Sequence, residues 1–130
     1  MLNLRAAARV ITREYESAFA PLGVTASQFS ILVALDAKPA WPMSELAQLL
    51  SMDRTTLTRV LGPMKRDGWV LSRADTSDGR ASLISLSDQG KAKLPELIAA
   101  WNTVQTRMMT KLGPKAGPLL SQLQSLLQTT

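Results

Sequence analysis

The sequence contains no cysteine and no histidine among its 130 residues. Without cysteine, the chain has no disulfide framework, no thiol redox sensor and no cysteine nucleophile. Without histidine, it also lacks the commonest zinc ligand and the commonest general base, so a Ser-His-Asp hydrolase cannot be built. The composition therefore argues against an enzyme, and we expect neither a metal site nor a cofactor.

Long apolar runs are missing as well, since none approaches the roughly 20 residues that span a bilayer. The first five residues, Met1–Arg5, lack the order of a charged segment followed by an apolar one that marks a signal peptide. We therefore expect a cytoplasmic protein with no membrane contact. A hydrophobic fraction of 45 % in a chain of this length indicates one folded domain.

What the chain has in excess is positive charge, with a formal net charge of +5. A basic balance favours a polyanionic partner. The segment 44–91, however, holds seven basic and six acidic residues, a net charge of only +1, so the flanks carry the excess. The face that each charge occupies is therefore more informative than the total.

The apolar periodicity predicts an α+β, mostly helical fold. In chain order, we expect helices over 2–19, 25–37, 45–50 and 53–66, two strands over 69–72 and 83–86, a long helix over 87–112 and a last helix beyond 114. The two strands flank the turn-forming segment 75–79 and predict a β-hairpin.

Residues that begin and end helices support these boundaries. Thr25 and Gln28 have the spacing of a capping box, and Ser44, Asp53 and Ser87 are expected caps of the following helices. The two prolines in 38–42 predict a loop. Pro95 is expected either to kink the long helix or to delay its start.

The fourth expected helix has two faces of different chemistry. One is an apolar stripe that should face the core: Leu57, Val60, Leu61 and Met64. The other carries two arginines, two threonines and no carboxylate: Arg54, Thr55, Thr58 and Arg59. Arginine can form paired hydrogen bonds with guanine, and threonine can contact phosphate or a thymine methyl group.

Together with the short helix before it, the tight turn at Ser51–Met52 and the hairpin after it, this helix predicts a winged helix-turn-helix. The outer face would then enter the major groove of DNA. The alternative is that it is the solvated basic face of an ordinary helix.

The hairpin supports the same interpretation through its arginines. Arg80 directly follows the tip and Arg73 lies on the first strand, so a thin ribbon could enter the minor groove. The alternative is an exposed turn in which these arginines pair with Asp75 or Asp78. Both interpretations hold together if Asp78 orients an arginine that also contacts phosphate.

The segment Asp78–Ser87 resembles the wing signature of the MarR (multiple antibiotic resistance regulator) family, with Ser87 where threonine is usual. Residues 53–59 and 65–70 resemble that family's recognition helix and its exit into the wing. The resemblance covers about Leu4 to Leu127. It implies a single domain over 1–130, in which a DNA-binding lobe (25–87) is flanked by dimerisation helices (1–20 and 88–130).

The resemblance further implies an obligate dimer, palindromic DNA sites and, in many members, release from DNA by a small aromatic or phenolic ligand. By matching positions, Arg80 would be the minor-groove arginine of the wing and Asp78 its orienting partner. Two departures from the family pattern are expected to matter. Gly62–Pro63 should bend the recognition helix, and a short N-terminus would limit the dimer interface.

Terminal leucines are the candidate dimer contacts, because lone helices seldom leave so much apolar surface in water: Leu2, Leu4, Leu119, Leu120, Leu123 and Leu127. The alternative is that the last helix folds back onto its own core.

Ligand contacts are harder to choose. Arg5, Arg9 and Arg13 form a basic stripe, either a solvated face with Arg13 paired to Glu16 or a contact from Arg9 to a ligand carboxylate. The three tryptophans are either core residues or pocket walls, and Trp41 is the candidate wall.

The sequence thus predicts a sequence-specific DNA-binding regulator, more specifically a homodimeric repressor with a small effector. A winged-helix module that binds protein and not DNA is the rival, and it would be insensitive to salt and to replacement of Arg54, Arg59 or Arg80. A small enzyme that uses carboxylates has no clustered acidic motif to support it.

Overall fold

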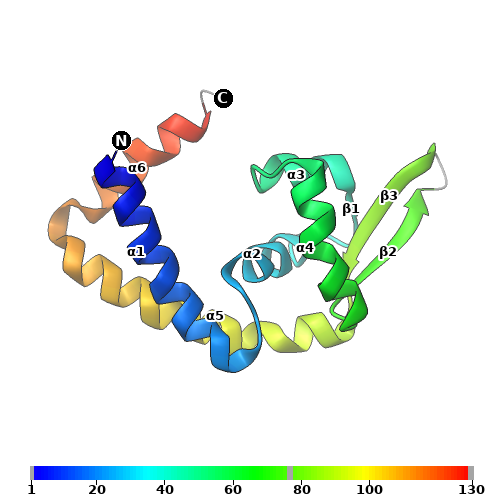
Figure 1. The fold of residues 1–130 in the computed structure, drawn as a ribbon, viewed down its shortest axis with the longest axis horizontal. Coiled ribbons are helices and arrows are strands. Elements are labelled where there is room, and N and C mark those ends of the chain that lie inside the picture. Colours follow the sequence, from blue (N-terminus) through cyan, green and yellow to red (C-terminus); the bar gives the residue numbers. More distant parts are fainter. Residues whose placement is uncertain (1, 76–77, 129–130) are drawn as a thin grey trace.

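A computed structural model of the chain describes residues 2–75 and 78–128, and places the side chains of 3–74 and 82–127. Figure 1 shows a lobe of short helices and a small sheet, from which α1, the far half of α5 and α6 extend. The elements are α1 (Leu2–Phe19), η1 (Ala20–Leu22), α2 (Ala26–Leu35), β1 (Trp41–Pro42), α3 (Met43–Leu49), α4 (Arg54–Arg66), β2 (Val70–Asp75), β3 (Asp78–Leu86), α5 (Asp88–Leu112), η2 (Gly113–Lys115) and α6 (Ala116–Gln128). The mostly helical α+β fold is confirmed.

The predicted hairpin is confirmed, and its strands are longer than expected. β2 and β3 pair antiparallel from Val70 with Leu86 outwards, through Arg73 with Leu83. The segment 38–42, predicted as a loop, ends in a third strand, because Trp41 pairs with Ile84 and gives the sheet the order β1-β3-β2. Proline has no N–H to donate, which confines such a strand to the edge of a sheet.

Three of the four predicted helix caps are confirmed. Thr25 forms the full capping box, Asp53 accepts a hydrogen bond from the Thr56 N–H at 2.7 Å, and Ser87 accepts one from the Gly90 N–H at 3.0 Å. The predicted cap at Ser44 is wrong. α3 begins two residues earlier than expected, at Met43, and Pro42 occupies the cap position without a side-chain hydrogen bond. Because Trp41 and Pro42 pair with β3, the chain enters the helix directly at Met43, which places Ser44 inside its first turn.

The apolar stripe of α4 faces the core as predicted. Leu57, Leu61 and Met64 are fully buried, among core residues from α1, α2, α3, β3 and α5. Because this stripe is anchored in the core, the opposite face of α4 is held on the surface of the lobe.

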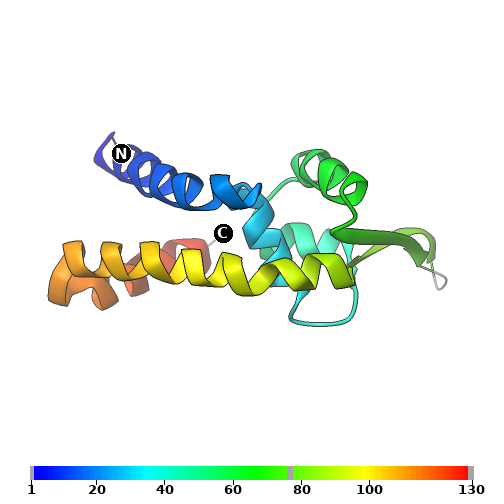
Figure 2. The same cartoon turned by 90° about the horizontal axis from the view of Figure 1, so that it is seen from below.

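α5 connects the lobe to the other end of the molecule. It is a helix of 25 residues, about 37 Å long, and Figure 2 shows it running along the length of the protein. The helix begins at Asp88 and continues through Pro95, so of the two alternatives for Pro95 the delayed start is wrong. α4 likewise continues through Pro63 to Arg66. Leu94 and Leu97 of α5 belong to the core of the lobe.

α1 lies along the far half of α5. The Tyr15 hydroxyl donates to Gln105 Oε1 at 2.5 Å, and Glu14 Oε2 lies 3.5 Å from Arg107 Nη2. α6 follows the η2 turn at the far end of α5 and runs back toward the middle of the molecule (Figure 1). Among the described residues, the buried cluster of the lobe includes none from α6, so this helix does not fold back onto that core.

Within the described chain, no single helix is long and apolar enough to cross a membrane; α1 with η1 and α2 meet the length and composition criteria only as a pair bent by 77°.

Candidate nucleic-acid interface

The four polar residues predicted on the outer face of α4 are brought together by the structure. Arg54, Thr55, Thr58 and Arg59 are all exposed and line one shallow hollow of about 510 Å³. The turn before the helix contains Ser51 at φ 54°, a left-handed conformation that reverses the chain sharply between α3 and α4. The tight turn predicted at Ser51–Met52 therefore presents this face of α4 to solvent.

Asp53 is the N-cap of α4, and its carboxylate is hydrogen-bonded to the backbone of that helix. The hydrogen bond from the Thr56 backbone N–H lowers the pKa of Asp53, and the positive charge of Arg59 lowers it further. The carboxylate is therefore ionised at neutral pH and stabilises the positive end of the helix dipole. Its negative charge is neutralised in part by the helix end and does not cover the outer face.

The arginines of the lobe are available to a partner. Among the described side chains, the ion pairs are Lys38 with Glu45 and Arg107 with Glu14, and neither involves Arg54, Arg59 or Arg73. Arg73 is exposed on β2, opposite Leu83. The donors of these three guanidinium groups therefore face solvent, where a phosphate or a base edge can accept hydrogen bonds.

The tip of the wing lies partly outside the described residues. The backbone of Asp78 and Arg80 belongs to β3, but the side chains of Asp75, Asp78 and Arg80 are outside the described set. The roles of Arg80 in the minor groove and of Asp78 as its orienting partner therefore stay predictions.

The structure does not bring the two candidate ligand residues, Arg9 and Trp41, into a common pocket. Arg9 is exposed on α1. Trp41 lies on β1 beneath Lys38, whose Nζ is 4.1 Å from the ring centroid and 2.8 Å from Glu45 Oε1. These contacts of Lys38 with Trp41 and Glu45 stabilise the segment between α2 and α3. The predicted Arg13–Glu16 pair is also absent among the described ion pairs, because Glu16 accepts the Ala26 N–H at the start of α2.

A second surface, which the sequence did not identify as a unit, is an apolar groove of about 510 Å³ between α2, α3 and α5. Its lining includes Val33, Leu49 and Ile98, whose exposed fractions are 42 %, 57 % and 42 %, and the ring of Trp101. A smaller hollow of about 210 Å³ shares Phe29, Ser30 and Trp101 with it and adds Tyr15 and Gln105. The sequence contains one indication of this groove: apolar residues lie on nearly every face of α2, so more than one face of this helix is expected to be covered.

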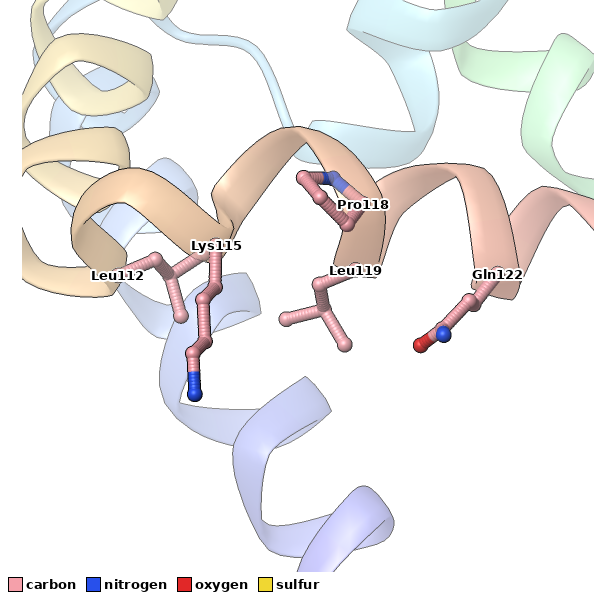
Figure 3. Close-up of a pocket in the computed structure, with 5 residues that line it drawn as sticks. All are labelled: Leu112, Lys115, Pro118, Leu119 and Gln122. Carbon is pink, nitrogen blue, oxygen red and sulfur yellow. The ribbon is translucent and has the colours of Figure 1, made fainter.

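Most of the terminal leucines lie at the end of the molecule opposite the wing. Leu4, Leu119, Leu120 and Leu127 are exposed, Leu123 is half-buried, and the Leu2 side chain lies outside the described set. Where α5 meets α6, a hollow of about 480 Å³ is lined by residues that include Leu112, Lys115 and Leu119. Figure 3 shows these three side chains and Gln122 pointing to the same side of this corner.

Comparison with known proteins identifies the family of this fold and its role in DNA binding. Residues 24–82 match the sequence model of the MarR family. The regulator MosR of Mycobacterium tuberculosis, solved in complex with DNA, is 34 % identical, with a TM-score of 0.89, over 98 % of this chain and 92 % of MosR. This chain belongs to the MarR family.

Other transcription regulators match over most of the chain. CouR, a transcriptional repressor solved on a 23-mer DNA duplex, is 28 % identical with a TM-score of 0.89, over 95 % of this chain and 89 % of CouR. The organic hydroperoxide resistance transcriptional regulator of Bacillus subtilis is 27 % identical over 97 % of this chain and 82 % of its own length. These relatives are transcription regulators and not enzymes. The predicted winged helix-turn-helix is therefore confirmed, and the chain is a DNA-binding regulator of the MarR family.

Proposed function

We propose that this protein is a homodimeric repressor that binds a palindromic DNA site through α4 and the wing and leaves it when a small, uncharged aromatic ligand binds. The observation that carries the DNA-binding part is the outer face of α4, where two arginines and two threonines lie together on a helix anchored in the core. Neither arginine forms an ion pair with another described side chain. MosR and CouR, whose structures contain DNA, share the fold that presents this face.

Exposed leucines support the dimer. Leu119 and Leu120 remain 38 % exposed on α6, a helix that packs on no part of the described lobe core. A second copy related by a two-fold axis buries such a patch against itself. It also sets two recognition helices about 34–36 Å apart, one turn of DNA, which matches a palindromic site.

Repression is supported by the relatives. CouR is a transcriptional repressor, and the repressor YetL of Bacillus subtilis is 36 % identical over 64 % of this chain and 51 % of its own length. A dimer that occupies two half-sites side by side covers roughly two turns of DNA and excludes other proteins from them.

The apolar groove is the proposed effector site because it joins the lobe to the helix that leads away from it. α2 and α3 form one wall and α5 the other, so a ligand between them bears on both parts of the molecule. Beside it, the rings of Tyr15, Phe19, Phe29 and Trp101 lie near one another, with Tyr15 and Trp101 centroids 6.5 Å apart and Phe19 and Phe29 centroids 4.7 Å apart. All four residues line the smaller hollow, where a ligand ring can stack against an aromatic side chain.

The polar groups of the two hollows define the ligand class. Ser30 and Asn102 line the groove, Tyr15 and Gln105 line the adjoining hollow, and neither lining includes a charged residue. Burial raises the pKa of Tyr15, so this phenol stays neutral at physiological pH. Burying an unpaired charge is costly, whereas a hydroxyl or amide can be satisfied by these partners. The groove therefore suits an uncharged aromatic molecule, and not the carboxylate that a contact from Arg9 would require.

The experiment that tests the proposed function is a titration of labelled DNA from upstream of the protein's own gene, followed by fluorescence anisotropy at several salt concentrations. We expect tight binding, two protomers per site by sedimentation, and a steep loss of affinity with salt through counterion release. A random duplex is the control and should bind much more weakly. Equal, weak binding to both duplexes would contradict the proposal and favour the protein-interaction module.

The ligand class is tested with two probes that share a ring and differ in charge, 2-naphthol and 2-naphthoate. We expect naphthol to quench tryptophan fluorescence, through Trp101, at a concentration at least about tenfold lower than naphthoate, because the groove offers no countercharge. Val33→Phe, which fills part of the groove without adding a tryptophan, should reduce the difference. Tighter binding of naphthoate would show that a cation reaches the site.

A further inference from the structure

The end of the recognition helix is held in one conformation. Gly68, at φ 81°, turns the chain out of α4, and the Gly68 and Trp69 N–H groups donate to the carbonyls of Lys65 and Met64 at 3.1 and 2.9 Å. These bonds are those of a Schellman-type helix end, which satisfies the last carbonyls of α4. The direction of Gly68–Trp69 is therefore determined by the direction of α4.

The start of α5 is bonded to this same helix end. The Ser87 hydroxyl donates to the Gly68 carbonyl at 2.5 Å while it accepts the Gly90 N–H at 3.0 Å. The Ser87 N–H donates to the Trp69 carbonyl at 3.1 Å. One side chain thus caps α5 and ties it to the last turn of α4.

Gly90 brings the two backbones into closer contact than any other residue type allows. A Cβ atom at this position would lie 2.2 Å from the Trp69 carbonyl oxygen and 2.8 Å from Leu86 Cδ1. On the next turn, Lys93 Nζ lies 4.9 Å from the centroid of the Trp69 ring. The first two turns of α5 therefore pack against the Gly68–Trp69 segment. We call the four residues Gly68, Trp69, Ser87 and Gly90 the α4–α5 junction.

The other contacts between α5 and the lobe are mainly apolar, through Leu94 and Leu97. Apolar contact is favourable but non-directional, so it holds the helix against the lobe without setting one angle. Hydrogen bonds and close backbone contact depend on direction and distance. The junction is therefore the feature that can define the angle between α4 and α5.

We infer that Ser87 and Gly90 set this angle and thereby determine the half-site spacing that the dimer accepts on DNA. The inference rests on the proposed function, because spacing has a meaning only for a dimer on a palindrome. Ser87 and Gly90 are positioning residues, since they act through α4 and touch no base.

The geometry makes spacing sensitive to small changes at the junction. Arg54 begins α4 twelve residues before Arg66, about 18 Å from the junction at 1.5 Å per residue. A rotation of about 5° moves that end by about 1.6 Å, and the symmetric shift in a partner doubles it to about 3 Å. The rise of one base pair is about 3.4 Å, so a few degrees are enough to change the preferred spacing.

Three variants of Ser87 separate its two bonds. Ser87→Thr keeps a hydroxyl that can both cap α5 and donate to Gly68. Ser87→Asp keeps a good cap, since a carboxylate accepts the Gly90 N–H, but it has no proton to donate to the Gly68 carbonyl. Ser87→Ala removes both interactions. A role confined to capping predicts that Ser87→Asp behaves like the wild-type protein.

The measurement is selection of binding sites from a random duplex pool with each protein, followed by anisotropy on duplexes whose half-sites are separated by one base pair more or fewer. Sedimentation and thermal denaturation establish that each variant is a folded dimer. We expect Ser87→Thr to keep the wild-type spacing and affinity. Ser87→Asp should lose about fivefold in affinity at that spacing and discriminate less between spacings.

The possible outcomes distinguish the inference from the proposed function. Ser87→Asp with the wild-type spacing profile would overturn the junction and leave the proposed function intact. A wild-type protein that enriches no palindromic site would overturn the proposed function, and with it the role of spacing. A loss of affinity by Ser87→Asp that is equal at every spacing would also overturn the inference, because the effect would then not depend on angle.

Discussion

Replacing Arg59 with alanine is expected to weaken binding to the specific DNA site about 5- to 150-fold, the equivalent of about 1–3 kcal/mol for a paired hydrogen-bond contact to a base. The guanidinium is exposed, lies beside Arg54 and Thr58 in the hollow of α4, and has no ion pair among the described side chains. Its removal therefore leaves no buried group without a partner in the free protein. The loss should appear in DNA binding and not in the melting temperature.

The matched control is Arg13→Ala, which removes the same charge from an exposed position on α1. Anisotropy on the specific and the random duplex should show that Arg59→Ala reduces the ratio of the two affinities, whereas Arg13→Ala leaves that ratio unchanged. If the two variants lose affinity equally on both duplexes, net charge alone drives binding. The outer face of α4 would then be an ordinary solvated face.

The parts of the fold that were predictable from sequence are those determined by neighbours along the chain. Thr25 with Gln28, Asp53 with Thr56, and Ser87 with Gly90 lie three residues apart, and each cap formed as predicted. The apolar stripe of α4 depends only on helical spacing, so its burial and the exposure of the arginines on the other face followed from the same pattern.

The parts that were not predictable depend on contacts between distant segments. Strand β1 exists because Trp41 meets Ile84, which is 43 residues further along the chain. Glu16 was a possible partner of Arg13 on its own helix, in one of the two interpretations of the basic stripe, but its carboxylate accepts the Ala26 N–H. A hydrogen bond to a free N–H at a helix start stabilises the fold more than an exposed ion pair, which contributes little.

The structure places the two candidate ligand residues apart for the same reason, and their contact with a ligand stays a prediction. Arg9 and Trp41 were chosen by residue type, and residue type does not tell which wall of the fold a side chain joins. Trp41 is held under Lys38 at the edge of the sheet, while Trp101 is the tryptophan that lines the groove. Only the packing of α2 against α3 and α5 distinguishes these two positions.

Gly90→Ala is expected to destabilise the protein by about 2 kcal/mol or more, although alanine is the better helix former. Intrinsic propensity favours alanine over glycine inside a helix by about 1 kcal/mol. Against this, the new methyl group would lie 2.2 Å from a backbone oxygen, the Trp69 carbonyl, which cannot move aside as a flexible side chain can. Overpacking of a close contact costs about 1–3 kcal/mol and sometimes more, and here relief requires α5 to shift from the sheet.

The comparison variant is Lys91→Ala, an exposed position on the same turn of α5, where the effect should stay within about 0.5 kcal/mol. Chemical denaturation of both variants measures the difference in the free energy of unfolding. A Gly90→Ala protein as stable as the wild type would mean that α5 moves away from Trp69 at little cost, and that the angle between α4 and α5 is soft. Destabilisation by Gly90→Ala alone would instead mean that the close contact between α5 and Trp69 cannot be relieved at little cost, as the proposed control of half-site spacing requires.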